Sequence, residues 1–258
     1  MAVKAERTPD ESAARSERWS PKLIDLSRPL NLETVDALFG DLVSDGKNAY
    51  FRDMSIDVVV DFSTANACSC MLKIPDHVAT HVDASVHTVE GKGWLEDIDL
   101  TRLIGEAVVL DLDRGGTDYG YTVEDMEQAK PEVLPGDIVL IYSGFRDAKP
   151  GERMRQTYLT AESAQWLVDR GAHAVGIEPA SPDHVQIGWY ELGWGEKPTP
   201  NPPPWPAHGT LLQNDVYIIE GLTNLDRIKG QRVRFAALPA LVPGLTGFPV
   251  RAVAWVER

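Results

Sequence analysis

The apolar positions of the chain fall first into short segments with the composition of β-strands. Three such segments, rich in Val and Ile or in alternating apolar residues, cover residues 22–27, 55–62 and 67–74, a pattern that favours pleated, half-buried backbone. Residues 1–20 contain few large apolar side chains and cannot bury enough surface to offset the entropy of ordering. We therefore predict a flexible N-terminal arm over 1–20 and one folded domain over 21–258.

The middle of the chain alternates apolar strands with helical segments. The predicted strands cover residues 108–112, 137–144 and 174–179. Helices are predicted after Thr122 and Thr160, which are N-cap candidates because acidic side chains follow each within three residues. Gly171 is placed to end the second helix. This β-α-β-α-β order is typical of an α/β fold or a mixed sheet.

The last third of the chain predicts an antiparallel or mixed part of the sheet. Its strands cover residues 216–222, 233–238 and 250–256, and no helical pattern separates the last two. Before them, six of the nine residues in 198–206 are proline, which predicts a stiff, extended loop. That loop is either a rigid surface connection or the wall or lid of a pocket.

Charge and hydropathy exclude several classes of partner. The 258 residues contain 25 Lys and Arg against 39 Asp and Glu, a net charge of −14, which repels nucleic acid and anionic membrane surfaces. No apolar run approaches the roughly 20 residues that cross a bilayer, and the N-terminus lacks the apolar segment of a signal peptide. We expect a cytoplasmic protein with a small-molecule substrate. Cys68 and Cys70 are predicted to be reduced thiols in a strand, because they lie too close together for an ordinary disulfide.

Chemistry-bearing residues concentrate in one eleven-residue window. Three of the six histidines of the chain, His77, His81 and His87, lie there together with Asp83. Imidazole and carboxylate are ligands that zinc and manganese accept, and a three-ligand site leaves a position open for water. On a straight strand, at roughly 3.3 Å per residue, His77 and His81 would be about 13 Å apart. The segment must therefore bend, through a helical or turn-like stretch and a further kink that aims Asp83 at the same point.

This window predicts a metal-activated hydrolase, because a metal lowers the pKa of bound water to about 7. His87 then becomes the general acid or base, or else has a purely supporting role. A second, weaker pair lies downstream: His208 follows the proline-rich segment, and Glu220 ends an apolar run in which a carboxylate needs a partner.

These residues also carry a resemblance to a known family. The window from His77 to His87 resembles the His-x-Gly-Thr-His-x-Asp-x-Pro-x-His signature of the cyclase-like metal-dependent hydrolases, the family of bacterial kynurenine formamidase and isatin hydrolase. Further segments resemble the opening strand, a central acidic segment, the second metal-binding stretch and the closing strand of that family. These segments are residues 23–30, 174–183, 206–228 and 247–256.

The resemblance implies a swivelling β/β/α fold with a mixed sheet, assembled as a homodimer or homotetramer. It implies that His77, His81 and Asp83 hold a first metal, that Asp83 bridges to a second, and that His87 moves protons. By the same resemblance, His208 and Glu220 hold the second ion. The spacing of these last two is similar to the two-metal formamidases, whereas the proline-rich approach to His208 is more similar to the single-manganese isatin hydrolases. The cofactor is thus expected to be one or two ions of Zn²⁺ or Mn²⁺.

Two positions depart from the signature. Ala79 stands at the glycine and Ser85 at the proline, so we expect the backbone at 79 to avoid a glycine-only conformation and that at 85 to lose a fixed φ. Glu178 stands where the family has Asp. Glu178 and Asp183 are each open to a structural or a catalytic role.

The expected activity is cleavage of an amide or lactone carbonyl bond in a small aromatic or cyclic substrate by a metal-activated water. This would make the protein an amidohydrolase acting on C–N bonds other than peptide bonds, either an arylformamidase or a cyclic amide hydrolase, with lactonase activity as a further option. The alternative is a non-catalytic metal-containing protein of the same fold that binds a small molecule. Several aromatic side chains could stack on such a substrate or instead belong to the core or an interface: Phe51, Phe62, Trp189, Tyr190, Trp194 and Trp205.

Overall fold

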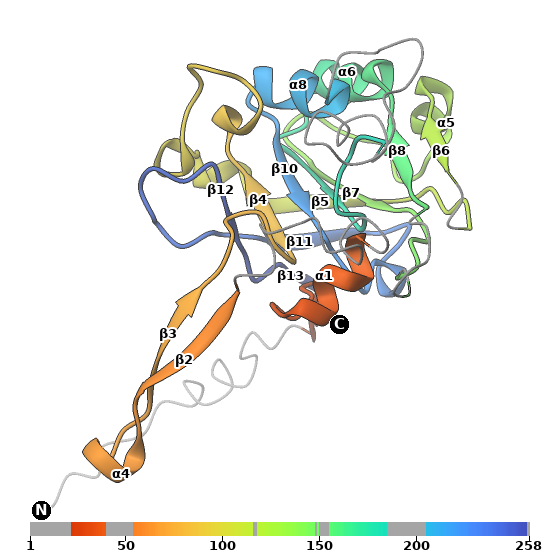
Figure 1. Cartoon of the computed structure of the whole chain (residues 1–258). Coiled ribbons are helices and arrows are strands. Elements are labelled where there is room, and N and C mark those ends of the chain that lie inside the picture. Colours follow the sequence, from red (N-terminus) through yellow and green to blue (C-terminus); the bar gives the residue numbers. More distant parts are fainter. Residues whose placement is uncertain are drawn as a thin grey trace, which may run out of the picture.

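A mixed sheet organises the fold (Figure 1). The computed structural model describes residues 22–39, 54–115, 118–147, 149, 155–184 and 205–256. Across the sheet the described strands lie in the order β1 (Lys22–Asp25), β13 (Val253–Val256), β11 (Arg232–Ala236), β5 (Ile104–Asp111), β7 (Ile138–Tyr142), β9 (Ala174–Ile177), β10 (Tyr217–Glu220), β4 (His81–Asp83) and β12 (Gly247–Pro249). Strands β5, β7, β9 and β10 pair in parallel, and the other neighbours are antiparallel. The predicted mixed α/β fold is confirmed.

Three helices lie together against the parallel strands (Figure 1): α5 (Val123–Gln128), α6 (Ala161–Asp169) and α8 (Pro206–Gln213). A cluster of buried aliphatic side chains from these helices and from β5, β7, β9 and β10 fills the space between them. Both predicted N-caps are present, since Thr122 Oγ1 accepts from the Asp125 N–H and Thr160 Oγ1 accepts from the Ser163 N–H, each at 3.2 Å. Gly171 follows α6 with φ +74°, the left-handed conformation expected at the end of a helix.

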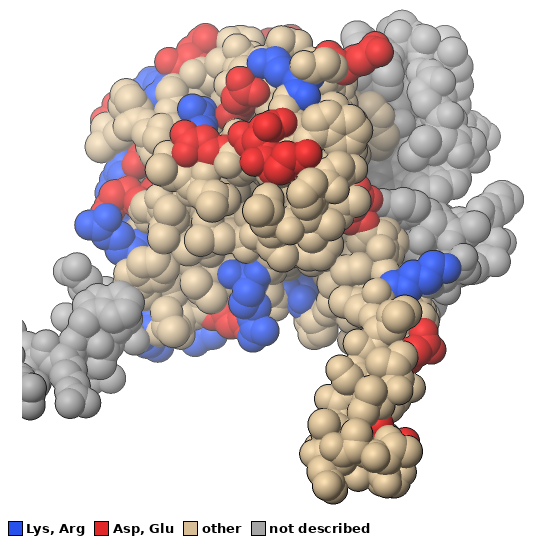
Figure 2. All heavy atoms as spheres, turned by 90° about the vertical axis from the view of Figure 1, so that its left-hand side faces the viewer, with Lys and Arg blue, Asp and Glu red and all other residues tan. Residues whose placement is uncertain are grey.

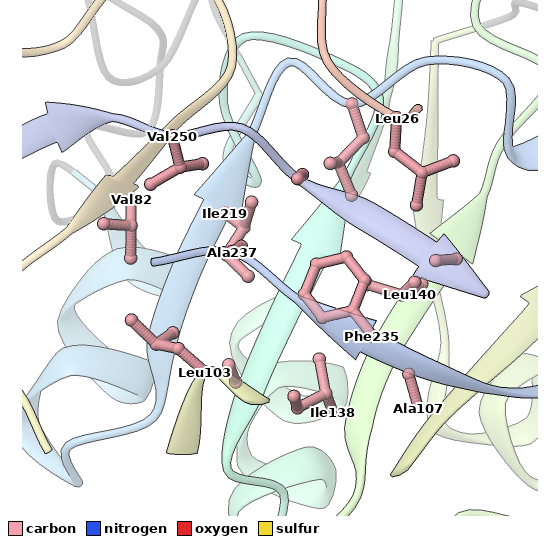
Figure 3. Close-up of a cluster of buried hydrophobic side chains, with 14 of the residues drawn as sticks. Leu26, Val82, Leu103, Ala107, Ile138, Leu140, Ile219, Phe235, Ala237 and Val250 are labelled. Atoms are coloured by element: carbon pink, nitrogen blue, oxygen red, sulfur yellow. The ribbon is translucent and has the colours of Figure 1, made fainter. Parts of the chain in front are cut away.

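The sheet curls around a second core on its other face. Side chains from strands far apart in the sheet order, such as Ile24 of β1 and Val82 of β4, belong to one buried cluster. Figure 3 shows Phe235 of β11 near the middle of this cluster, beside Leu140 of β7. A third, smaller cluster packs α1 (Leu32–Phe39), which the sequence pattern did not predict, against the segment that precedes β4. This packing holds β4 and its approach in place.

The remaining elements are short. Four 3₁₀ helices are described: η1 (Ser85–His87), η2 (Leu95–Asp97), η3 (Leu100–Arg102) and η5 (Leu225–Arg227). Strand β6 (Tyr119–Tyr121) pairs in parallel with β8 (Thr157–Leu159). A hairpin of β2 (Ser55–Val60) and β3 (Ser69–Lys73), with α4 (Phe62–Ala65) at its tip, projects from the body (Figure 1). Cys68 and Cys70 are free and exposed, and Cys70 lies in β3.

Several predictions concern the ends and the proline-rich segment. The arm over 1–20 and residues 198–204 lie outside the described residues, so both stay predictions. The extended loop was predicted to run through Pro206, and this is wrong, because Pro206 begins α8. Proline suits the first turn of a helix, where its missing N–H is not needed. Among the described helices, none combines the length and apolar composition that a bilayer span requires.

Candidate metal centre

A bend and a short strand position the side chains of residues 77–87 at the site. His81 and Asp83 belong to β4, and because side chains alternate along a strand, both lie on the same face. Of the helical or turn-like stretch predicted between His77 and His81, the turn-like form is confirmed, because the chain bends there and no helix is described between β3 and β4. The chain bends between His77 and His81, and at the bend Ala79 has φ +55°. The expectation that Ala79 avoids this left-handed conformation is wrong, since a non-glycine residue can adopt it at a small cost.

The bend is held by close backbone contacts. The carbonyl of Ala79 accepts a hydrogen bond from His81 Nδ1 at 3.1 Å, which directs Nε2 of the same ring into the site. Thr80 Oγ1 donates to the Gly221 carbonyl at 2.6 Å. A Cβ at Gly221 would lie 2.4 Å from the Ala79 oxygen, so the two segments can approach this closely only because residue 221 has no side chain.

Strand pairing brings Glu220 to the centre. Antiparallel pairing of β10 with β4 sets Glu220 directly opposite His81, so their side chains emerge side by side. His81 Nε2 lies 3.3 Å from Glu220 Oε2 and 3.4 Å from Asp83 Oδ1. The three residues are buried, and they present ligand atoms that all lie within 4.8 Å of one another. Two ligands of one ion at about 2.1 Å can be about 4 Å apart, so this spacing suits a single ion.

Helix α8 supplies His208 from the other side. Its Nε2 lies 3.2 Å from Glu220 Oε1 and 3.5 Å from Asp83 Oδ2. Its Nδ1–H donates to Asp183 Oδ2 at 2.7 Å. Asp183 is fully buried and thus fixes which nitrogen of His208 faces the centre, an arrangement common behind metal-binding histidines. The open question about Asp183 is answered by these contacts: it positions His208, and the sequence offered no local signal for this pairing.

The buried polar atoms at the centre fit a divalent cation. Among the described residues, His81 Nε2, Asp83 Oδ2 and Glu220 Oε1 are buried without a hydrogen-bond partner, which is costly unless a further group satisfies them. All three atoms belong to the facing residues just described, and all are nitrogen or carboxylate oxygen ligands. No cysteine contributes, and imidazole and carboxylate donors suit Zn²⁺ or Mn²⁺.

The pKa shifts at the centre also indicate a site that favours positive charge. Burial opposes a proton on His81, but the carboxylates of Asp83 and Glu220 outweigh it and raise the pKa of His81 to about 10. Burial likewise opposes charge on His208, yet Asp183 and the same two carboxylates raise its pKa well above the ordinary value. Burial disfavours ionised Asp83, but His77 and the other imidazoles hold its pKa well below the ordinary value. The raised pKa values of His81 and His208 show that positive charge is favourable beside these carboxylates.

His77 and His87 complete the cluster at its more exposed side. His77 Nδ1 lies 2.8 Å from Asp83 Oδ1, and His77 Nε2 lies 2.8 Å from Thr246 Oγ1, which donates to Asp76 at 2.8 Å. The His87 ring stacks on His77 with centroids 3.9 Å apart and is exposed. Desolvation, and then repulsion from His77, lower the pKa of His87. His87 is thus an uncharged imidazole beside the ligand cluster, with its side chain in contact with solvent.

The remaining candidate residues make structural contacts, border the centre or lie away from it. Glu178 accepts from the N–H and the hydroxyl of Ser143, each at 2.8 Å, a structural contact, and its pKa is raised by burial. The Trp205 ring packs edge-on to His208 with centroids 5.5 Å apart and so borders the centre. Phe62 lies at the tip of the projecting hairpin (Figure 1), which argues against stacking on a substrate in the site of its own chain. The other aromatic candidates, Phe51, Trp189, Tyr190 and Trp194, lie outside the described residues.

The sequence from β1 to the segment that holds Asp183 matches a family model. Residues 24–184, more than half of the chain, match the model of the "Putative cyclase" family. The chain belongs to the Cyclase family. Within this family match lie the bend, β4 and Asp183, whereas α8 and β10 lie beyond it.

Named relatives extend the similarity over the rest of the chain. An isatin hydrolase of Roseibium aggregatum is 25% identical over 201 residues, which cover 71% of this chain and 73% of the relative. A kynurenine formamidase of Bacillus cytotoxicus is 24% identical over 230 residues, covering 89% of this chain and 95% of the relative. The solved structure of isatin hydrolase A from Ralstonia solanacearum superposes with a TM-score of 0.72 at 21% identity, covering 98% of this chain and 100% of the other. The chain therefore shares the fold of that solved isatin hydrolase.

Proposed function

We propose that this protein is a metal-dependent hydrolase that cleaves the amide bond of a small aromatic or cyclic substrate. The observation that carries the proposal is the convergence of three buried, unpartnered ligand atoms, from His81, Asp83 and Glu220, beside the exposed imidazole of His87. The named relatives are hydrolases of a cyclic amide and of a formamide, which supports the choice of an amide over other carbonyl compounds. Lactones share the same ring carbonyl and are the next substrate class to test.

The residues that would hold the ion are those gathered around Asp83: His77, His81, Asp83, His208 and Glu220. Asp83 is central, because one of its oxygens faces His77 and His81 and the other faces His208. With an oxygen on each side, Asp83 would contribute to the site whether it holds one ion or two, the two options that the resemblance leaves open. When bound, a divalent ion polarises a carbonyl and lowers the pKa of a water molecule.

His87 is suited to the proton transfers of the reaction. Stacking on His77 orients its ring, and its side chain is exposed, so the ring can exchange protons with water beside the ligand cluster. A neutral imidazole accepts a proton from the attacking water and then donates it to the leaving nitrogen, which cannot depart as an anion. Asp183 and Thr246 would act by orienting a ligand histidine, because each binds such a ring on the side that faces away from Asp83.

The test begins with chelator-stripped protein resupplied separately with Zn²⁺ and Mn²⁺. Turnover of N-formylkynurenine, isatin and a small lactone is followed while bound metal is counted in the same samples. We expect metal-restored hydrolysis of at least one amide. His87→Ala should lower turnover by about 100-fold or more with metal content unchanged, whereas His173→Ala, a histidine outside the cluster, should leave both unchanged. Loss of metal together with activity in His87→Ala would make His87 a ligand.

Metal binding without hydrolysis of any of the three compounds would contradict the proposal. The result would instead favour the alternative that the cluster holds a metal for small-molecule binding without turnover.

A further inference from the structure

An open cleft lies between the 3₁₀ helices η2 and η3 and the start of β10, away from the candidate metal centre. Its volume is about 420 Å³, within the range of roughly 300–1,000 Å³ that is usual for small-molecule sites. Of the described residues that line it, none belongs to the ligand cluster. Tyr217 borders the cleft, and Glu220 of the centre lies three positions along the same strand. The two side chains are therefore about 10 Å apart and on opposite faces of β10.

Arg102 brings an unpaired positive charge to the wall of this cleft. Among the described residues, none forms an ion pair or a hydrogen bond with its guanidinium, and its Nε atom is buried without a partner. Only the terminal nitrogens can then be satisfied, by a group that enters the cleft. Partial burial of a cation without a counter-ion is costly. A carboxylate is the matching anion, because it accepts two N–H groups of a guanidinium at once.

The other basic side chain of the cleft is already neutralised. Lys92 Nζ lies 3.2 Å from Asp215 Oδ2, and the Ser85 hydroxyl donates to Asp215 Oδ1 at 2.9 Å. Both oxygens of Asp215 are thus engaged, and the ion pair adds no net charge to the cleft. The charges left to meet a ligand are those of Arg102 and of two further carboxylates.

These carboxylates, Asp97 and Asp99, are exposed, and each has an oxygen available to a ligand. Asp97 Oδ2 accepts from the Trp94 N–H at 2.9 Å, and Asp99 Oδ1 accepts from the N–H and the hydroxyl of Thr101 at 3.0 and 2.7 Å. The other oxygen of each carboxylate accepts no hydrogen bond from the described part of the chain. The hydrogen bonds from Thr101, and then the charge of Arg102, lower the pKa of Asp99. An ammonium group, which has three donors and no acceptor, suits such oxygens.

The charge of the surrounding surface favours a ligand that carries both signs. The chain has a net charge of −14, which repels a free anion approaching from solution. Residues 85–102 lie at the left of Figure 1, and Figure 2, seen from that side, shows acidic and basic side chains close together. A zwitterion has no net charge, so its carboxylate can reach Arg102 without the repulsion that a simple anion meets.

We propose that this cleft binds a free α-amino acid with an apolar side chain. The α-carboxylate pairs with Arg102 and the ammonium with Asp97 or Asp99. Trp94, which is 43% exposed, supplies aromatic surface for the side chain. A metal ion suits the cleft less well, because its carboxylates belong to none of the converging ligand groups found among the described residues. This inference does not depend on the proposed activity.

The first experiment titrates metal-loaded wild type with L-phenylalanine and with two analogues of it. The analogue 3-phenylpropanoate lacks the ammonium, and phenethylamine lacks the carboxylate. Isothermal titration calorimetry measures the dissociation constant and the number of molecules bound per chain. We expect one molecule of L-phenylalanine per chain, bound about 10-fold or more tightly than either analogue. No binding of L-phenylalanine, or equally tight binding of either analogue, would overturn the proposal.

Variants distinguish the cleft from the metal ion, which an amino acid could also bind. Arg102→Gln should weaken L-phenylalanine binding about 10-fold or more, with metal content unchanged. Trp94→Ala, at an exposed residue that contributes only its backbone N–H to the fold there, should weaken it several-fold and serves if Arg102→Gln fails to fold. Arg227→Gln is the matched control, because Arg227 is exposed and also ends a 3₁₀ helix, and it should bind as wild type does. Wild-type affinity in the folded cleft variants would place the amino acid elsewhere and overturn the proposal.

Discussion

Asp183 holds His208 by its side chain and by its backbone at the same time. The Oδ2 atom of Asp183 accepts from His208 Nδ1 at 2.7 Å and from the His208 backbone N–H at 3.1 Å, and Oδ1 accepts from the Ala207 N–H at 2.7 Å. One carboxylate therefore satisfies the first N–H groups of α8, where a negative charge is favourable, and aims the ligand nitrogen of the same helix at Asp83. The same side chain thus holds the start of α8 and orients the His208 ring toward the candidate metal centre.

Replacing this carboxylate should weaken metal binding. Asp183→Asn keeps the shape but sets an amide NH₂ group where donors now point, so His208 loses its orientation. We expect metal affinity to fall about 10- to 100-fold, measured by competition with a chromogenic chelator. Asp125→Asn is the matched control. Asp125 also accepts a hydrogen bond at the start of a helix, from the N–H of the N-cap residue Thr122 at 2.8 Å, but this helix, α5, lies away from the centre. An equal loss of affinity in both variants would show that helix stability alone explains the effect.

The number of bound ions should depend on Glu220. Its two oxygens face different histidines, Oε2 toward His81 at 3.3 Å and Oε1 toward His208 at 3.2 Å, as expected for a carboxylate shared between two ligand sets. With the two-metal arrangement, Glu220→Gln should lower the metal content from about two ions per chain to about one, measured by elemental analysis after stripping and reloading. The exposed Glu106→Gln should leave it unchanged. Unaltered content in Glu220→Gln would instead support a single ion.

The elements with strong local signals could be predicted from the sequence. Thr122 and Thr160 begin their helices because hydroxyls and acidic neighbours act within one turn, and the strands β5, β7 and β9 each contain an apolar run. Helix α8 was missed because the prolines before it argue against a helix, although proline at the first position is compatible with one. The three residues of β4 form a strand only because β10 and β12 pair with them on either side, which no local pattern could show.

The ligand types were predictable, whereas their arrangement was not. The spacing of His77, His81 and Asp83 identifies imidazole and carboxylate donors in one window, and a straight strand could not bring the first two together. How the chain bends depends on the left-handed backbone at Ala79 and on its contact with Gly221, a residue 142 positions further along. Likewise the role of Asp183 depends on contacts with residues 24 and 25 positions away in sequence.

Acid should reduce the contribution of Asp125 to stability. Partial burial opposes its ionisation, but hydrogen bonds from Thr122, Tyr119 and Arg114 outweigh it and lower the pKa of Asp125 to about 2. A lowered pKa means that the folded state favours the carboxylate, so this contribution is complete above the ordinary value of 3.8 and is lost as the pH falls toward 2. The free energy of unfolding should differ between wild type and Asp125→Asn by about 1 kcal/mol, and the difference should shrink between pH 5 and pH 3.

Urea unfolding of metal-free protein at a series of pH values measures this difference. Metal-free protein is used so that metal release from the centre does not add to the pH dependence. A gap between the two proteins that is as large at pH 3 as at pH 6 would show that Asp125 does not act through its charge.

The close approach of Gly221 to Ala79 predicts that a side chain at residue 221 would disrupt the bend. At Gly221, φ is +66° and an added Cβ would lie 2.4 Å from the Ala79 oxygen, the same oxygen that accepts from His81 Nδ1. Gly221→Ala should therefore destabilise the protein by about 2 kcal/mol or more and also weaken metal binding, because His81 loses its orientation.

Gly209→Ala is the matched control: it lies in α8 next to His208, and nothing lies within 4 Å of its added Cβ. That variant should stabilise by up to about 1 kcal/mol with metal affinity unchanged. Urea unfolding and metal titration of both variants decide the matter, since wild-type metal affinity in Gly221→Ala would mean that the bend does not control the position of His81.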